Sequence, residues 1–107
     1  MNTQFAGRWR IIEMELWDQD AVDLVGPAFI EIRNDGTGRF RFIVVEGFID
    51  CRWNHDPESQ ALEFTWEGSD EGDPVSGRGW VELEADGSLK GRIYFHNGDD
   101  SAFRASV

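Results

Sequence analysis

Hydrophobic and polar residues alternate along most of the chain, and turn-forming segments recur about every 8 to 14 residues. This pattern predicts short antiparallel strands, because successive side chains of a strand point to opposite faces. One segment differs: residues 17–29 are expected to hold a short helical turn before Pro27. The expected strands are eight, at approximately residues 5–16, 27–33, 37–45, 48–54, 61–67, 76–84, 88–96 and 100–106.

Two turns of the same type, residues 34–36 and 85–87, fix the register of the strands beside them. A two-residue Asp-Gly loop would put apolar and charged residues on one face of both hairpins. A three-residue loop with its glycine in the left-handed conformation corrects both hairpins. Glu31 then lies opposite Arg39 on the outside, and Ile30 lies opposite Phe40 on the inside.

A second type of turn and a bulge determine which residues face inward in three strands. Glu46 and Gly47 are expected to form a two-residue loop that brings two apolar sets together on the inner face: Val44, Phe42 and Phe40 with Ile49, Cys51 and Trp53. In the first strand, apolar residues change parity, so we expect a bulge near Ile11 and Ile12 that turns all of them inward. These residues are Trp9, Ile11, Ile12, Met14 and Leu16.

Consecutive antiparallel strands of this number favour an all-β fold, a closed up-and-down barrel over residues 1–107, because closure removes unpaired strand edges. A two-sheet sandwich is the alternative. The inward residues include many large rings, and an eight-stranded barrel is just wide enough to be filled by side chains or to hold one small ligand. Both a packed core and a ligand cavity therefore remain open.

The composition narrows the function classes. A net charge of −11 argues against nucleic-acid binding and against docking to an anionic membrane. Such a charge also fits an acidic inhibitor or immunity-type interaction protein. Cys51 is the single cysteine, the first residues lack the pattern of a secretion signal, and no apolar run is long enough to span a bilayer, so we expect a soluble, cytoplasmic protein.

The segment FAGRW, residues 5–9, resembles the Gly-x-Trp signature on the first strand of the calycins, the lipocalin- and avidin-type barrels. In those families an arginine of the last strand commonly packs across the tryptophan, and the resemblance implies this role for Arg104. It also implies a small apolar ligand inside the barrel, near Trp9, Trp53, Trp66 and Arg104. The ending GRIYFHNGDDSAFRA also resembles small uncharacterised bacterial proteins, a likeness that transfers no activity.

The hairpin of residues 78–95 carries an unusual outer face. The three-residue loop puts Arg78 opposite Tyr94, Trp80 opposite Arg92 and Glu82 opposite Lys90, all pointing away from the core. Tryptophan, tyrosine and arginine together are typical of interface hot spots, although ordinary cross-strand stacking gives the same pattern. An even-length turn after residue 96 would add Phe103 to this face and turn Arg104 inward.

Catalytic and metal-binding signals are weak, and we expect neither a metal nor a cofactor. Asp18, Asp20 and Asp23 lack the spacing of a calcium loop. His55 with Asp56 and His96 with Asp99 match no triad or zinc spacing. Cys51 is expected to be a buried apolar group. Asp50, Glu67 and Arg104 at the barrel mouth are the residues that an enzyme would use.

The sequence therefore favours a small binding protein, with an apolar or aromatic ligand inside the barrel or a protein partner on the Trp80/Tyr94 face. A homodimer through that face is expected. An enzyme is the rival class.

The expected strand register predicts how the fold responds to an inserted residue. One residue inserted into the 34–36 or the 85–87 loop should destabilise the fold strongly, because it turns the apolar residues of one strand outward. Urea denaturation of the insertion variants measures this, and an insertion with no effect on the unfolding midpoint would contradict the pairing scheme.

Overall fold

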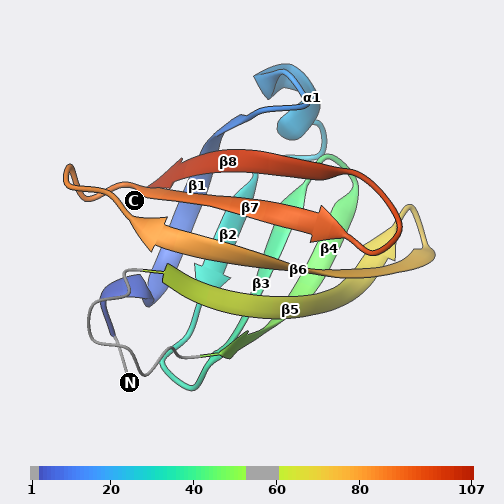
Figure 1. Ribbon diagram of the computed structural model, residues 1–107. Helices are drawn as coiled ribbons and strands as arrows, with labels where there is room; N and C mark the ends of the chain where they lie inside the picture. The colour runs from blue at the N-terminus through green and yellow to red at the C-terminus, as the bar shows by residue number, and fades with distance from the viewer. Residues whose placement is uncertain (1–2, 53–60) are drawn as a thin grey trace.

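The computed structural model describes residues 3–52 and 61–107 and forms a closed barrel of eight antiparallel strands (Figure 1). Each strand pairs with its neighbours in sequence, and the last strand pairs with the first. The all-β barrel is confirmed and the sandwich is excluded. The strands are β1 Gly7–Met14, β2 Phe29–Ile32, β3 Thr37–Phe42, β4 Val45–Arg52, β5 Ala61–Asp70, β6 Asp73–Leu83, β7 Leu89–Phe95 and β8 Asp100–Ser106.

Two short helical segments accompany the strands: η1 (Thr3–Phe5) before β1, and α1 (Gln19–Val22) in the long connection from β1 to β2. The helical turn expected before Pro27 is therefore present. Asp18 caps α1 by accepting a hydrogen bond from the amide of Ala21 at 3.0 Å. Within the described residues, no helix has the length and the apolar character needed to cross a membrane.

Both predicted three-residue loops are confirmed. Gly36 and Gly87 adopt φ values of 88° and 86°, a conformation that costs glycine little. In each loop the aspartate before this glycine accepts hydrogen bonds from the amide and the hydroxyl of the residue after it, Thr37 or Ser88. These hydrogen bonds lower the pKa of both aspartates, Asp35 and Asp86, below their ordinary value.

The turn between β3 and β4 was predicted in the wrong place. The loop is Ile43–Val44, with Ile43 at φ 55°, and Phe42 pairs with Val45. Gly47 is not a turn residue but a strand residue opposite Phe40. Ile49 and Cys51 still face inward, because the shift preserves the parity of their strand.

The bulge in β1 is confirmed, but its expected effect is only partly right. The register against β8 shifts between Ile11 and Glu13, and Met14 is buried. Ile12 and Leu16 are nearly half exposed, not inside. Ile12 is the extra residue of the bulge and points outward, and Leu16 lies beyond the end of the strand.

Aromatic rings packed over glycines fill the barrel. Four inward aromatic residues lie directly opposite a glycine on the next strand: Phe40 opposite Gly47, Phe64 opposite Gly79, Trp66 opposite Gly77, and Phe103 opposite Gly91. A Cβ atom on Gly47 would lie only 2.4 Å from the ring of Phe40. The missing side chains therefore provide the space that the rings occupy.

The rings also contact one another. Phe40, Phe42, Phe95 and Trp66 form a closed circuit, with ring centroids of successive members between 4.9 and 6.1 Å apart. Trp17 extends the circuit toward α1 by its contact with Phe42. Such edge-on and offset contacts are the arrangements that aromatic pairs prefer.

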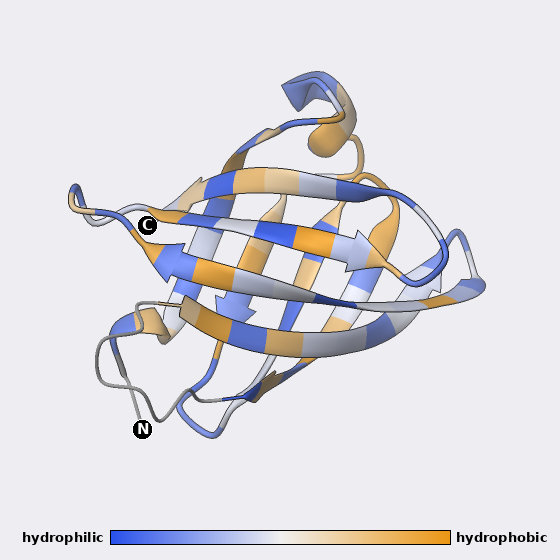
Figure 2. Cartoon of the chain, in the orientation of Figure 1, coloured by the Kyte–Doolittle hydropathy of each residue, from blue (hydrophilic) through white to orange (hydrophobic). Residues whose placement is uncertain are grey.

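Chain segments cover both ends of this core. Val22 of α1 is fully buried, and its carbonyl oxygen accepts a hydrogen bond from the amide of Ile43 at the end of β3. Phe5 of η1 is buried at the opposite end. Hydrophilic and hydrophobic residues alternate along the strands between these ends (Figure 2).

Gly47 and Phe40 provide a test of the ring-over-glycine packing. Gly47→Ala should lower the free energy of unfolding by about 1–3 kcal/mol, because the new methyl group overlaps the Phe40 ring. In the Gly47→Ala/Phe40→Leu double variant, the loss should be clearly smaller than the sum of the two single losses, since the smaller side chain makes room for the methyl group. Urea denaturation measures all three variants, and additive losses would contradict this packing.

Candidate binding surface

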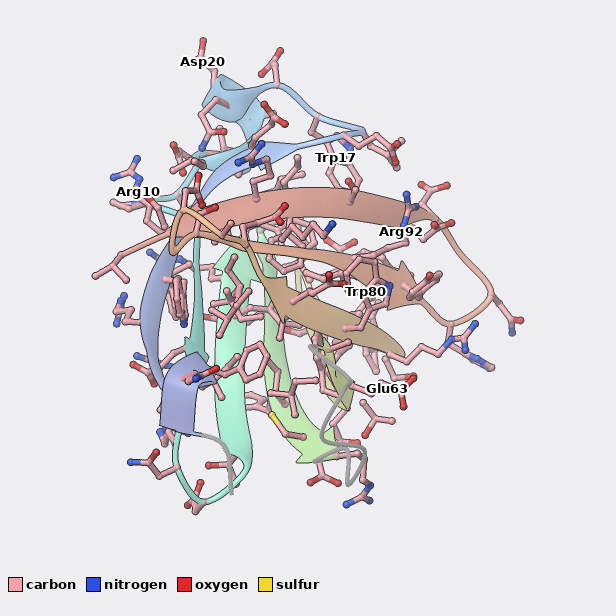
Figure 3. All side chains as sticks on the ribbon, turned by 60° about the vertical axis from the view of Figure 1, so that its left-hand side comes forward. Arg10, Trp17, Asp20, Glu63, Trp80 and Arg92 are labelled. Atoms are coloured by element: carbon pink, nitrogen blue, oxygen red, sulfur yellow. The ribbon has the colours of Figure 1, made fainter. Side chains whose placement is uncertain are left out.

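The outer face of the β6–β7 hairpin has the predicted register. Arg78 lies opposite Tyr94 and Trp80 lies opposite Arg92, with all four side chains directed away from the core. The guanidinium of Arg78 lies 4.8 Å from the centre of the Tyr94 ring, within cation–π range. Figure 3 shows Trp80 and Arg92 on this surface, with Glu63 of β5 nearby. Their placement is confirmed, and their role as an interface stays a prediction.

The neighbouring strands extend this face into rows of side chains. One row runs across four strands from Asp50 through Thr65 and Arg78 to Tyr94. The row beside it pairs Phe48 with Glu67 and Glu67 with Ser76. Phe48 has 63% of its surface exposed, which is unusual for a phenylalanine.

An open groove of about 840 Å³ lies over these rows and is called the outer groove below. Its aromatic walls are Phe48 on β4 and Tyr94 on β7. The strands between them, β5 and β6, have 10 and 11 residues, the longest of the described strands, and bend along their length (Figure 1). The polar side chains of the outer groove are Asp50, Thr65, Glu67, Ser76, Arg78, His96 and Asn97.

A second open groove, of about 500 Å³, lies on the other side of Trp80. Arg92 lines it and forms ion pairs with Asp100 and, at 3.5 Å, with Glu15. The hydrogen bond to Asp100 is the main cause that raises the pKa of the Arg92 guanidinium. Arg92 is thus held in place by acidic partners on the wall of this groove, which Trp80 also lines.

Phe103 and Arg104 do not lie where the sequence placed them. The β7–β8 loop has three residues, His96–Gly98, with Asn97 at φ 57°, and not an even number. The side chains of β8 are therefore reversed relative to the prediction: Phe103 is buried and Arg104 is exposed, 4.0 Å from Asp86. The predicted interface loses Phe103.

The same reversal removes Arg104 from the barrel interior, so it does not pack across Trp9. The indole nitrogen of Trp9 donates a hydrogen bond to the carbonyl oxygen of Phe5 at 3.0 Å. Trp9 and Trp66 are both buried in the hydrophobic core, and the predicted ligand residue Trp53 lies outside the described residues. The two grooves described above both open on the outer surface.

Of the three residues considered for an enzyme, two share one groove and the third, Arg104, lies apart from them. Asp50 and Glu67 lie on the outer groove, diagonal to each other on β4 and β5, and not at the barrel mouth. Asp50 forms an ion pair with Arg52 at 2.9 Å. Arg104 lies on another part of the outer surface, beside the Trp80 groove.

Two of the acidic residues near α1, Asp18 and Asp23, have structural partners. Asp23 accepts hydrogen bonds from the amide of Ala28 and the side-chain amide of Gln19, and these, with the nearby Arg10, lower its pKa. In residues 3–52 and 61–107, no cluster of three or more histidine, cysteine or acidic side chains is arranged to hold a metal ion. His96 and Asp99 are exposed, whereas His55 and Asp56 lie outside the described residues.

Phe48 is a surface residue that was not singled out from the sequence. The turn was expected at Glu46 and Gly47, with a strand from residue 48 onward. Alternate residues of this strand face inward: Val45, Gly47, Ile49 and Cys51. This alternation indicates that Phe48 points outward.

Comparisons with known proteins do not assign the chain to a family. No protein-family model matches the chain, and neither a curated protein nor a solved structure matches it. Its function therefore has to be inferred from its own surface chemistry.

Cys51 is buried, as predicted, and burial raises the pKa of its thiol from 9.0 to about 11. At pH 9 a thiol with this pKa is only about 1% thiolate, where an ordinary cysteine would be half ionised. Alkylation of Cys51 by iodoacetamide at pH 9 should therefore be at least tenfold slower in the folded protein than in urea. The reason is that the reactive thiolate makes up about 1% of the thiol in the folded protein and about half of it in the unfolded chain. Equal rates, followed by mass spectrometry, would show that Cys51 is an accessible thiol.

Proposed function

We propose that the protein is a small binding module that holds a peptide segment of a partner protein in the outer groove, with Tyr94 of the Trp80/Tyr94 face as one wall and Phe48 as the other. The observation that carries the proposal is the contrast between the two sides of the sheet. The inner side is packed with rings, whereas the outer side of β4–β7 is concave and carries exposed Phe48 and half-buried Tyr94.

The chemistry of the outer groove suits a polypeptide. Its aromatic walls, Phe48 and Tyr94, stand three strand spacings apart, about 14 Å, which is wide enough for an extended chain and its side chains. Aromatic residues and arginine supply much contact area with little loss of side-chain freedom. Arg78 is already held by stacking on Tyr94, so it loses less freedom on binding.

Mixed charge in the groove would give the bound segment a direction. Asp50 and Glu67 lie toward β4 and β5, whereas Arg78 and His96 lie toward β6 and β7. A segment with a basic residue at one side and an acidic residue at the other would match this order. A second copy of the chain is one acceptable partner, as the predicted homodimer requires.

A calycin-like ligand inside the barrel is the weaker proposal. Gly7 and Trp9 keep the positions of the calycin signature, but Arg104 does not contact Trp9. An interior ligand would also have to displace rings that are packed against glycines.

The test uses a library of random dodecapeptides displayed on phage, selected on the immobilised full chain. We expect enriched peptides that bind the wild-type protein and lose at least about tenfold in affinity on Tyr94→Ser, because one aromatic wall is removed. Glu82→Gln is the matched control, since Glu82 lies on the same hairpin but outside the outer groove.

Two results would overturn the proposal. One is the absence of enrichment over many rounds, and the other is a set of peptides that bind Tyr94→Ser as tightly as the wild type. Thermal unfolding of both variants establishes that they are folded. Peptides that lose affinity on Trp80→Ala alone would move the site to the neighbouring groove and would contradict the outer groove as the site.

A further inference from the structure

Half of the ten basic residues of the chain lie together on the outside of β1–β3. Five arginines form this group, which is called the arginine surface below: Arg8, Arg10, Arg33, Arg39 and Arg41. It is on different strands from the outer groove, and in Figure 3 Arg10 projects on the opposite side from Trp80.

Phe29 organises the arginine surface. Its side chain points outward from β2 and is nevertheless only 6% exposed, because guanidinium groups cover it. The guanidinium carbon of Arg8 lies 3.8 Å from the ring centre, and those of Arg39 and Arg41 lie 5.3 and 5.4 Å away. The N–H groups of a guanidinium that stacks on a ring point outward in the plane of the guanidinium. They can therefore still donate hydrogen bonds to an anion.

The acidic partners of this surface do not balance its charge. Glu31 is within ion-pair distance of Arg8, Arg33 and Arg39, at 2.9 to 3.8 Å, and Asp23 pairs with Arg10. With Asp35, which interacts electrostatically with Arg33, and Glu46, which lies opposite Arg41, five positive and four negative charges leave +1. Because the whole chain carries −11, the remainder carries −12. The charge of the molecule is therefore unevenly distributed, with Glu46 at the border.

A small recess of about 230 Å³ lies within the arginine surface. The side chains of Arg8 and Arg10 on its wall are about half exposed and, being two residues apart on one strand, stand side by side. Their spacing along β1 is about 7 Å, which equals the spacing of alternate side chains in another extended chain.

We propose that the arginine surface binds an acidic segment of a partner protein, with alternate carboxylates placed against Arg8 and Arg10 and a further carboxylate near Arg39. The arginine forks match carboxylates in charge and in geometry. The inference does not rest on the outer groove, and either can fail alone.

A nucleic acid fits this surface less well than a short acidic segment. Nucleic acids carry charge continuously along their length, and a strand longer than the width of β1–β3 would lie against acidic neighbours such as Glu46 and Asp50. A short extended segment can place a few carboxylates on the arginines and end there.

The experiment measures fluorescence anisotropy of a labelled peptide of about ten residues in which Glu and Ser alternate, a length that spans the barrel surface. The comparison probes are the same peptide with Lys for Glu and a single-stranded DNA of equal charge. We expect the acidic peptide to bind at low salt, to weaken as salt rises, and to lose at least about tenfold in affinity on Arg8→Gln/Arg39→Gln.

Matched variants separate charge from packing. Arg52→Gln and Arg8→Gln each remove one positive charge, the first outside and the second inside the arginine surface. Arg52→Gln should alter the affinity less than twofold, and Arg8→Gln should lower it by more. Arg8→Lys keeps the charge but loses the stacked guanidinium fork, so its affinity should lie between those of the wild type and Arg8→Gln. Circular dichroism establishes that each variant is folded.

Three outcomes would overturn the inference: acidic and basic peptides that bind equally, an Arg52→Gln variant as defective as the double variant, or DNA that binds more tightly than the acidic peptide. The last outcome would make a phosphodiester the partner chemistry. The phage selection on the outer groove is unaffected by any of them.

Discussion

The packing of an aromatic ring over a glycine on the next strand is the interaction on which the rest of the structure depends. A barrel of eight short strands has a narrow interior, and large rings fit inside only if their neighbours have no side chains. Gly47, Gly79 and Gly91 provide that space for Phe40, Phe64 and Phe103. The rings and the aliphatic core residues together bury the apolar surface that stabilises the closed sheet.

This packing also bears on the proposed function. Because the described inner side chains pack against one another, both proposed binding surfaces lie on the outside of the sheet. Two separate outer surfaces stand out, and they differ in chemistry. The outer groove is large, aromatic and of mixed charge, whereas the arginine surface holds a smaller recess and gathers positive side chains in an acidic molecule.

The sequence predicted the strands and most of the register because apolar alternation and Asp-Gly turns are local signals. Both three-residue Asp-Gly loops were confirmed, and with them the outward placement of Arg78, Trp80, Arg92 and Tyr94. The placement of these four residues depends on a single hairpin, and only one loop length in that hairpin keeps the apolar residues on one face.

The errors at the two turns that were predicted wrongly have a common cause. Glycine and asparagine can each have several structural roles, which a local pattern does not distinguish. Gly47 was taken as a turn residue, but its purpose is to make room for Phe40. The left-handed residue of the β7–β8 loop is Asn97, and the change in loop length reversed Phe103 and Arg104. The bend that forms the outer groove results from long-range closure of the barrel, which no local pattern encodes.

Ring-over-glycine pairs also restrict how such a sequence can change by mutation. At Gly47, a single substitution to any larger residue meets the Phe40 ring, whereas shrinking the ring first leaves a cavity. Each single step is therefore unfavourable, although exchanging the large and the small residue across the two strands would conserve volume. The two positions should consequently change together or not at all, while outward positions beside them can vary freely and acquire new binding surfaces without disturbing the barrel.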